Sequence, residues 1–278
     1  MKIAYFIMAH QNIKQLFKTI NAIYDPWNVY LLHIDVKAGE SYKQMVEQAF
    51  ANFGNIRIMA SRDIAWGAWT QVDIQLEAII ELLSQCDWDY FVNMSGLDYP
   101  LKSQAYIKEY LRVHPSNYIH VVDEPEGHRY AAERFRYDLD EEGNLIRGEE
   151  KPMFAESFPG MQSHFGSGWF ILTRSFCEYL VTHEQPKRIA DYYKHCLMSD
   201  ESYFQTVMMN SGDRFPHFKH NLRYIVMTHT GQFILNAAVL DPSHEENMMS
   251  SGLLFARKVD CTLYPEMVDR IDRVLFAR

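Results

Sequence analysis

The stretch KIAYFIMA at residues 2–9 is a short, almost continuously apolar run, and VYLLHID at residues 29–35 is a second run that ends in a carboxylate. A strand buried on both faces has this pattern, because its side chains meet apolar neighbours on either side of the sheet. Between the two runs, residues 12–24 carry apolar side chains at helical spacing, and Pro26 ends that helix. The beginning of the chain therefore predicts a buried strand, a helix and a second buried strand.

The alternation of strands and helices continues through the first half of the chain. The expected elements are a helix at 41–51, a strand at 56–60, a helix at 70–83 and a strand at 90–94. Short links between alternating strands and helices favour a parallel sheet. We therefore expect an α/β fold with a mostly parallel central sheet flanked by helices.

Polar residues follow several of these strands. His10 and Asp35 stand at the ends of the first two runs, and Ser95-Gly96-Leu97-Asp98-Tyr99-Pro100 follows the strand at 90–94. Ligands of such sheets gather at the C-terminal ends of the strands. A carboxylate at this edge can bind a ribose or a uracil-like ring, although a loop Asp that caps a turn would look the same in sequence.

Beyond a strand at 118–122 the regular pattern of apolar residues is lost. Residues 123–166 are polar and irregular, which is typical of a functional or mobile segment. The later elements are strands at 169–173 and 222–227 and helices at 175–183, 189–196, 200–210, 242–251 and 266–276. We find no repeat, low-complexity segment or linker, so we expect one domain.

The composition is that of a globular protein, with 47% hydrophobic residues and a net charge of −9. An acidic surface repels nucleic-acid phosphates, so DNA and RNA are poor partner candidates. The four cysteines lack the spacing of a zinc site and the density of a disulfide scaffold, and we expect reduced, largely buried thiols. The first strand directly follows Met1-Lys2 and no apolar run reaches about 18 residues. We therefore expect a cytoplasmic protein without a signal peptide or transmembrane segment, with peripheral contact at the inner membrane face left open.

Two charged pairs could carry chemistry. Asp200-Glu201 stands at the start of the predicted helix at 200–210, where Ser199 or Asp200 would be the cap. Acids there are often only first-turn residues, but such a carboxylate could also act as a general base. Arg257-Lys258 lies between apolar neighbours and could neutralise a departing diphosphate in place of a metal ion; an ordinary surface pair is the alternative.

Metal and cofactor motifs are missing. Asp87-Trp88-Asp89 has the spacing of a metal-binding Asp-x-Asp pair, but it stands before the strand at 90–94, on the wrong edge of the sheet, and indicates a turn. Neither His-Glu pair has a His three residues later, which excludes a zincin, and no P-loop or Gly-x-Gly-x-x-Gly is present. The acid-rich run around Asp138 has the pattern of a solvated loop rather than a hydrolase site. No metal and no cofactor are expected.

At these motifs the sequence resembles the core-2/I-branching β-1,6-N-acetylglucosaminyltransferases and the related peptide O-xylosyltransferases. The matching segments are residues 3–6, 9–10, 22–26, 33–37, 65–69, 90–96, 98–102, 166–170, 200–206 and 255–260. They follow one another in order over almost the whole chain, and this ordered set is far more specific than any single motif.

The resemblance implies a GT-A-like nucleotide-sugar-binding fold, a UDP-sugar donor with GlcNAc favoured, inversion at the anomeric carbon and no metal requirement. It also implies a carbohydrate or glycolipid acceptor. The expected organisation is a single glycosyltransferase domain, residues 1–278, with a donor-binding part at about 1–122 and an acceptor and catalytic part at about 123–278. The disulfide cysteines and membrane anchor of the animal Golgi members are missing, which indicates a bacterial-type protein of surface polysaccharide synthesis.

The resemblance also assigns roles to individual residues. Glu201 matches the catalytic base, and Arg257 and Lys258 match the cations that hold the diphosphate. The other donor-binding matches are His10, Asp35, Trp66, Ser95, Gly96 and Asp98. A looser match assigns acceptor binding to Arg134, Arg136, Tyr137, Trp169 and Tyr224.

Two departures from the family pattern matter. The branching enzymes carry an arginine upstream of the terminal lysine, whereas this chain reads Asn236-Ala237-Ala238-Val239 there, so Arg257 is expected to take that role. Some xylosyltransferases have an acid just before the Trp-Phe pair, and this chain has Gly168. Transfer from UDP-xylose and a non-catalytic nucleotide-sugar-binding homologue are the alternatives to transfer of GlcNAc.

Overall fold

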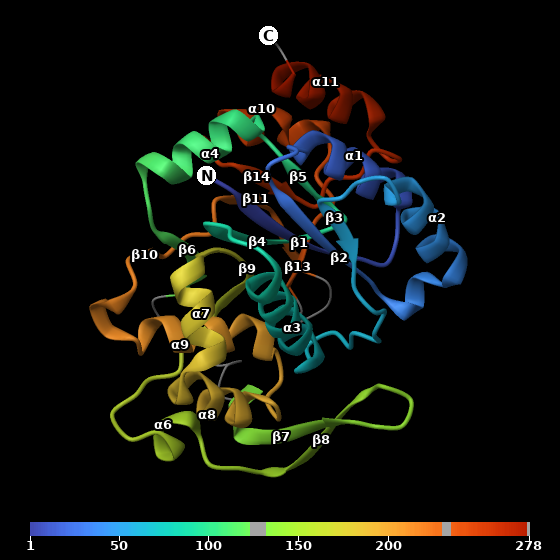
Figure 1. Cartoon of the computed structure of the whole chain (residues 1–278). Helices are drawn as coiled ribbons and strands as arrows, with labels where there is room; N and C mark the ends of the chain where they lie inside the picture. Colours follow the sequence, from blue (N-terminus) through green and yellow to red (C-terminus); the bar gives the residue numbers. More distant parts are fainter. Residues whose placement is uncertain (123–131, 230–234, 277–278) are drawn as a thin grey trace. The chain divides into compact units, whose positions relative to one another are not determined.

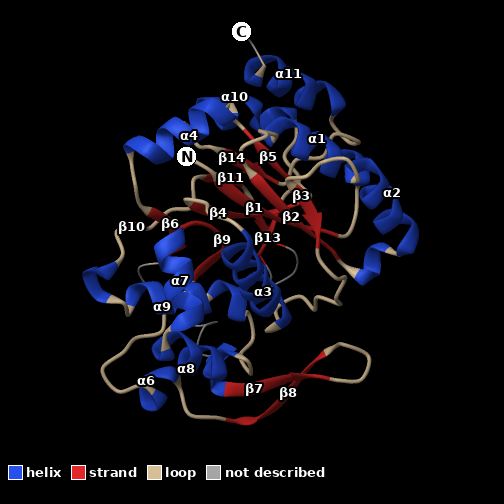
Figure 2. Cartoon of the chain, viewed as in Figure 1, coloured by secondary structure: helices blue, strands red, loops and turns tan. Residues whose placement is uncertain are grey.

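The computed structural model describes residues 1–122, 132–229 and 235–276 and divides into two compact units. The first unit comprises Met1–Ser61, Met94–Pro115 and Leu222–Arg278, and the second comprises Arg62–Asn93 and Ser116–Asn221. In each unit helices flank the strands (Figure 1, Figure 2). The expected α/β fold is confirmed, whereas the expected division into a donor part and an acceptor part stays a prediction.

Three parallel strands begin the first unit. They are β1 (Ile3–Ala9), β2 (Val29–Ile34) and β3 (Ile56–Ile58), and β2 lies between the other two. The connections run through α1 (Ile13–Ile23) and α2 (Glu40–Phe50). All residues of β1 except Met8 are buried, which is why this strand reads as a continuous apolar run. The strands and helices predicted here are confirmed to within a few residues.

A smaller sheet in the same unit joins segments that are distant in sequence. Its strands, in spatial order, are β11 (Arg223–Ile225), β14 (Phe255–Arg257) and β5 (Asp98–Pro100). Strand β14 runs parallel to β11 and antiparallel to β5. One hydrophobic cluster includes Tyr99 of β5, Ala256 of β14 and Val268 of α11 (Pro265–Leu275). This cluster secures the C-terminal segment of the chain to the loop after β4 (Tyr90–Ser95).

The second unit contains a mixed set of strands. Their order is β10 (His217–Phe218), β6 (Asn117–Val121), β9 (Gly166–Thr173) and β4. Strands β10 and β6 are parallel, and β9 runs antiparallel to both β6 and β4. The longer helices described in this unit are α3 (Thr70–Gln85), α7 (Arg174–Thr182), α8 (Glu184–Tyr193) and α9 (Tyr203–Met209).

Several predicted elements have different bounds in the structure. The segment at 123–166, expected to be irregular, contains the hairpin β7 (Phe135–Leu139) and β8 (Leu145–Glu150) and the short helix α6 (Phe154–Ser157). The hairpin strands have mostly exposed or partly buried side chains, so the sequence shows no alternation of apolar residues. Its turn is held by Asp140, which accepts hydrogen bonds from the Glu142 and Asn144 amides.

The helix predicted at 200–210 is also shorter. Ser199–Glu201 form a 3-10 helix, and α9 begins at Tyr203 without a side-chain cap. The strand predicted at 222–227 is divided between β11 and β12 (Met227–His229), which pairs with β13 (Leu235–Ala237). The helix predicted at 242–251 consists of a 3-10 helix at Pro242–His244 and α10 (Glu245–Ser250).

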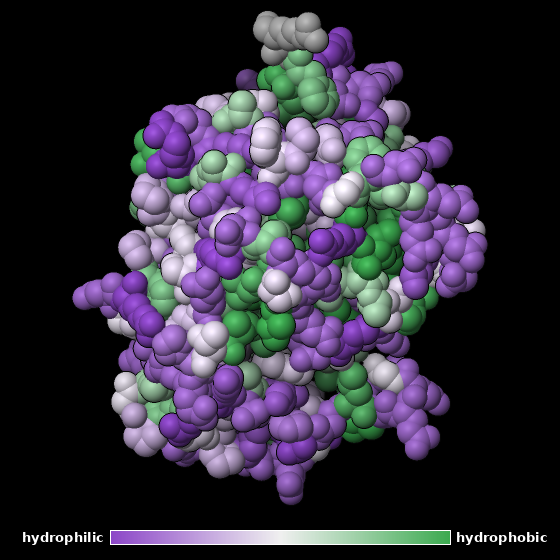
Figure 3. Space-filling model, viewed as in Figure 1, coloured by the Kyte–Doolittle hydropathy of each residue, from purple (hydrophilic) through white to green (hydrophobic). Residues whose placement is uncertain are grey.

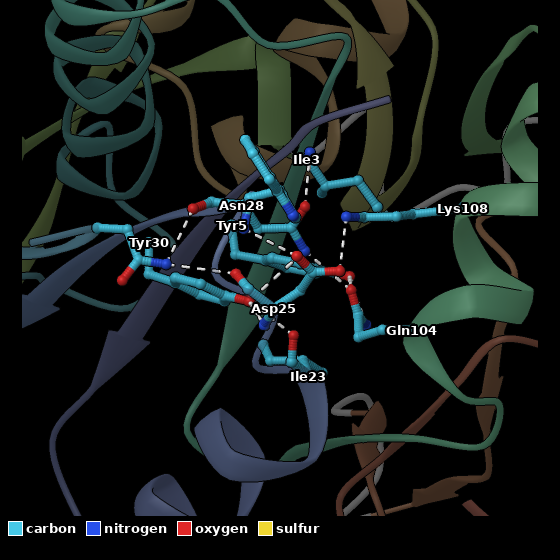
Figure 4. A network of polar contacts seen from close by, with 10 residues as sticks. Ile3, Tyr5, Ile23, Asp25, Asn28, Tyr30, Gln104 and Lys108 are labelled. Atoms are coloured by element: carbon cyan, nitrogen blue, oxygen red, sulfur yellow. Dashed lines mark hydrogen bonds and ion pairs between the residues drawn. The ribbon is translucent and has the colours of Figure 1, made fainter. Parts of the chain in front are cut away.

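A network of polar side chains lies near the beginning of β1 in the first unit (Figure 4). Asn28 accepts a hydrogen bond from the Ile3 amide at 3.0 Å and donates one to Gln104, which lies on α4 (Gln104–Val113), at 2.9 Å. Lys108 of α4 pairs with Asp25 at 2.7 Å, and both side chains are about four-fifths buried. The network therefore ties α4 to the loop between α1 and β2.

We expect Asp25→Asn to lower the free energy of unfolding by about 1–3 kcal/mol at pH 7, because Lys108 loses its buried partner. Burial raises the pKa of Asp25, but hydrogen bonds from Lys108 and the Trp27 amide outweigh this and lower the pKa below its usual range. Such a group stabilises the fold above its unfolded pKa and loses its contribution as the pH falls. Urea unfolding should therefore show a difference between wild type and variant that shrinks below about pH 4. A constant difference down to pH 2 would contradict this account.

Candidate active site

The C-terminal ends of β1 and β2 carry two of the predicted residues, and both lie in the first unit. The Asp35 amide donates to the Ala9 carbonyl at 3.0 Å, and the buried Asp35 carboxylate accepts from the Lys37 amide at 2.9 Å. His10 follows β1 and is exposed over much of its ring, yet desolvation lowers its pKa. The charge of Asp35 opposes this effect, whereas the charges of Arg257 and Lys258 add to it. The charges of Asp35, Arg257 and Lys258 therefore all act on His10.

The loop after β4 lies against the same strand end. The Gly96 amide donates to the Met8 carbonyl at 2.9 Å, and a side chain at Gly96 would bring its Cβ to 3.2 Å from the Cβ of Ala9. Ser95 caps the turn, because its hydroxyl accepts from the Leu97 amide at 3.1 Å. A small residue at position 96 thus permits the close approach of the loop to β1.

The buried carboxylate of Asp98 is the centre of an ion cluster. Its Oδ1 accepts from Nη1 of Arg257 at 2.7 Å, and its Oδ2 accepts from the Ser95 amide at 3.2 Å. The same Nη1 of Arg257 donates to the Ser95 hydroxyl. Nε of Arg223 lies 3.7 Å from Oδ2, and neither the Arg223 nor the Asp98 side chain has any exposed surface. The structure therefore brings Ser95, Asp98 and Arg257 together.

Arg223 is the residue of this cluster that the sequence prediction missed. It opens β11, and its neighbours Leu222, Tyr224, Ile225 and Val226 are apolar or aromatic. A charge in such a strand is seldom fully buried unless it has a partner. A single arginine in an otherwise apolar strand was therefore the sequence feature that could have indicated a buried ion pair at Arg223.

Positive charge exceeds negative charge in the cluster. The charge of Asp98 acts on three cations, namely Arg223, Arg257 and Lys258. Burial lowers the pKa of Arg223 to about 10, and burial together with the charge of Arg257 lowers the pKa of Lys258. Cations that are desolvated and repel one another are stabilised by a bound anion. The first unit therefore holds a site suited to an anion such as a diphosphate.

The predicted base lies in the second unit, on a turn fixed by its backbone. Met198 adopts a left-handed conformation with φ 55°, and its amide donates to the Gly67 carbonyl at 2.8 Å. The Glu201 amide donates back to the Met198 carbonyl at 3.1 Å. Gly67 follows Trp66, whose side chain is 59% exposed, so the loop that carries this predicted donor residue contacts the turn that carries Glu201.

Asp200 and Glu201 are adjacent acidic residues, and both are partly buried. Oδ1 of Asp200 is fully covered and has no hydrogen-bond partner in the described part of the chain. Burial raises the pKa of Asp200, and burial together with the charge of Asp200 raises the pKa of Glu201 to about 8. A carboxylate of this kind is a stronger proton acceptor than an exposed one, so Glu201 has the chemistry of a general base.

Gly168 of β9 leaves the space that the Asp200 carboxylate occupies. A Cβ at Gly168 would lie 2.8 Å from Oδ2 of Asp200, closer than carbon and oxygen atoms normally approach. The next residue, Trp169, is partly buried on the same strand.

Three of the predicted acceptor residues lie together at the β7–β8 hairpin of the second unit. Arg134 makes two hydrogen bonds to Glu150, at 2.9 and 3.0 Å, and Arg136 pairs with Asp138 at 2.6 Å. The Tyr137 amide donates to the His195 carbonyl at 3.0 Å. Trp169 belongs to the same unit, whereas Tyr224 lies on β11 of the first unit, packed against its hydrophobic cluster. Residues 123–131 of the predicted acceptor segment lie outside the described residues.

The described residues offer no cluster of three or more His, Cys, Asp or Glu side chains that could hold a metal ion. Asp87 and Asp89 lie between α3 and β4, where the sequence predicted a turn. All four cysteines are free thiols, two of them buried and two partly buried, as expected. In the parts of the chain that the structure describes, no helix is long and apolar enough to span a membrane. Figure 3 shows a mainly hydrophilic face with small hydrophobic patches.

Comparison with known proteins shows similarity to two groups of transferases. The chain is 24% identical over 257 residues to a β-1,3-galactosyl-O-glycosyl-glycoprotein β-1,6-N-acetylglucosaminyltransferase 3 from Ovis aries, covering 91% of this chain and 56% of that protein. It is 28% identical over 225 residues to xylosyltransferase 2 from Rattus norvegicus, covering 76% of this chain and 25% of that protein. Both relatives are glycosyltransferases by name.

The family follows from a family model. The model of the Core-2/I-Branching enzyme matches residues 3–243, and the chain belongs to this family. The chain spans about half the length of the sheep relative and a quarter of the rat relative. Among solved structures it is similar to the Staphylococcus aureus protein TarS 1-349, with a TM-score of 0.37 and 10% identity over 79% of this chain and 58% of that one.

The raised pKa of Glu201 predicts how stability depends on pH. A carboxyl group whose pKa rises on folding favours the folded state when protonated, so stability falls as the pH rises from about 4.5 to about 8. Glu201→Gln removes this loss, and we expect the variant to be more stable than the wild type by about 1–3 kcal/mol at pH 9 and similar to it at pH 4.5. Denaturant titrations at both pH values measure the difference. Glu149→Gln, at an exposed position of β8, is the control and should match the wild type. Equal stability of Glu201→Gln and wild type at pH 9 would argue against a destabilising carboxylate.

Proposed function

We propose that the protein is an inverting, metal-independent glycosyltransferase that moves a sugar, GlcNAc in the first instance, from a UDP-sugar to a carbohydrate hydroxyl. The observation that carries this proposal is the excess of buried positive charge around Asp98, in a chain of the Core-2/I-Branching enzyme family. Departure of a nucleoside diphosphate needs positive charge, supplied by a metal ion or by fixed side chains. Arg257 and Lys258 supply it in this proposal.

The proposed reaction is a direct displacement. Glu201 accepts the proton of the acceptor hydroxyl, and the hydroxyl oxygen forms a bond to the anomeric carbon on the face opposite UDP. The bond between the anomeric carbon and the diphosphate oxygen breaks as the new bond forms, which inverts the configuration. The leaving diphosphate takes the electron pair and is stabilised by Arg257 and Lys258.

The other predicted residues have supporting roles in this proposal. Asp35, His10 and Trp66 bind the nucleoside, with Ser95 and Gly96 in the loop beside it. Arg134, Arg136, Tyr137, Trp169 and Tyr224 bind the acceptor. We further propose bacterial surface polysaccharide synthesis as the setting and the cytoplasm, with peripheral contact to the inner membrane face, as the location. The unpaired cysteines support a reducing compartment.

Two alternatives concern the donor and the activity. Transfer from UDP-xylose is disfavoured because Gly168 stands where some xylosyltransferases have an acid, and the Asp200 carboxylate fills that space. A non-catalytic homologue is disfavoured because Glu201, Arg257 and Lys258 are all present. Thermal stabilisation by a panel of UDP-sugars distinguishes the donors, since a ligand at about 100 times its dissociation constant adds about 2.7 kcal/mol.

Two substitutions separate the proposed roles. Glu201→Gln should abolish sugar transfer and leave the affinity for UDP close to that of the wild type, because only the proton acceptor is lost. Lys258→Ala should lower turnover by about 10²–10³ and also weaken UDP binding, because it removes a charge from the leaving diphosphate. Transfer assays and calorimetric UDP titrations measure both effects. Near wild-type turnover of Glu201→Gln would show that another group is the base.

The proposed absence of a metal requirement is tested with a chelator. We expect the rate of transfer to be the same before and after dialysis against EDTA, and unchanged by added Mn²⁺ or Mg²⁺, because Arg257 and Lys258 neutralise the diphosphate. A strict requirement for Mn²⁺ would defeat this part of the proposal.

A further inference from the structure

We infer that Asp98 and Arg223 are positioning residues, which hold the guanidinium of Arg257 in place for the leaving diphosphate. The inference rests on the proposed function and adds to it, because it separates the residue that would touch the donor from the residues that act through it. Its basis is the buried ion cluster at the junction of β5, β11 and β14.

The sheet itself brings the three residues together. Arg257 and Asp98 are directly paired residues of the antiparallel strands β14 and β5. Arg223 lies on β11, on the other side of β14, in register with Phe255. Side chains of paired residues lie on the same face of a sheet, so Asp98 meets Arg257 without any movement of the backbone.

Asp98 is engaged with the protein on both of its oxygens. Oδ1 contacts Arg257 at 2.7 Å and the Ser95 hydroxyl at 3.3 Å, while Oδ2 contacts the Ser95 amide at 3.2 Å and Arg223 at 3.7 Å. The carboxylate is fully buried, whereas the Arg257 side chain is 15% exposed. Asp98 is therefore placed to act on Arg257, and of Asp98, Arg223 and Arg257 it is Arg257 that reaches the surface.

A carboxylate beside an anion site has two opposing effects. Its charge repels a diphosphate, which weakens donor binding. Its hydrogen bonds fix a long, flexible side chain, which strengthens donor binding because less freedom is lost when the donor arrives. We infer that the second effect is larger here, because the three paired strands and Ser95 hold Asp98 rigidly. The two effects change the affinity for the donor in opposite directions, so removal of the Asp98 charge shows which effect is larger.

The test compares UDP with uridine by calorimetric titration of the full chain. We expect Asp98→Asn to weaken UDP binding about tenfold and to leave uridine binding within about twofold, because only the diphosphate contacts Arg257. Arg257→Ala should weaken UDP binding by at least as much. The double variant should be no weaker than Arg257→Ala alone, since a positioning residue has no effect once the residue it positions is gone. Should Asp98→Asn not fold, Arg223→Lys, which keeps the charge, is expected to show the same pattern.

Asp25→Asn is the matched control, because it removes a largely buried acid of the same unit that pairs with Lys108 in the network of Figure 4. It should lower stability and leave the ratio of UDP to uridine affinity unchanged. Absence of UDP binding by the wild type, or wild-type UDP affinity of Arg257→Ala, would overturn the proposed function and this inference with it. Suppose that the wild type binds UDP and that Arg257→Ala binds it more weakly. Unchanged or tighter UDP binding by Asp98→Asn would then overturn this inference alone. Additive losses of UDP affinity in the double variant would do the same.

Discussion

The antiparallel pairing of β14 with β5 is the constraint on which the candidate donor site depends. It places the C-terminal pair Arg257-Lys258 beside the loop that follows β4, although the two segments are far apart in the sequence. The pairing is secured by the hydrophobic cluster beneath it, in which Tyr99 and Ala256 pack with α11. Rigid apolar packing therefore fixes the positions of the charged groups above the cluster. Their mutual attraction is not what determines this geometry. Asp98 can be buried because the adjacent strand β14 supplies Arg257 and β11, beyond β14, supplies Arg223.

In the second unit the candidate catalytic residues lower the stability of the fold. Asp200 and Glu201 stand on a short turn whose form depends on the left-handed Met198 and on the backbone of Gly67. Both carboxyl groups lose hydration there, and the covered Oδ1 of Asp200 receives no hydrogen bond from the described residues in return. Such an arrangement is unfavourable for folding and useful to a proton acceptor. Strain and unsatisfied groups gathered at one turn are typical of a functional site.

The sequence was sufficient for the features that depend on local pattern. Strand β1 and helix α1 could be predicted because a run such as KIAYFIMA and a helical stripe have few other interpretations. The β7–β8 hairpin could not, because its side chains bury too little surface to leave an alternating pattern. The late start of α9 at Tyr203, three residues after the predicted start, also left no signal, since the residue type of Met198 does not predict its left-handed conformation. Family motifs indicated Arg257, whereas Arg223 belongs to the site only through the pairing of β11 with β14.

Because Gly168 approaches the Asp200 carboxylate closely, the size of residue 168 determines whether that carboxylate can keep its position. A side chain at position 168 would meet Oδ2 of Asp200, so a residue larger than glycine there requires the Asp200 carboxylate to shift. A smaller residue at position 200 would remove this conflict. Replacement of residue 168 alone would therefore move the carboxylate whose charge raises the pKa of Glu201.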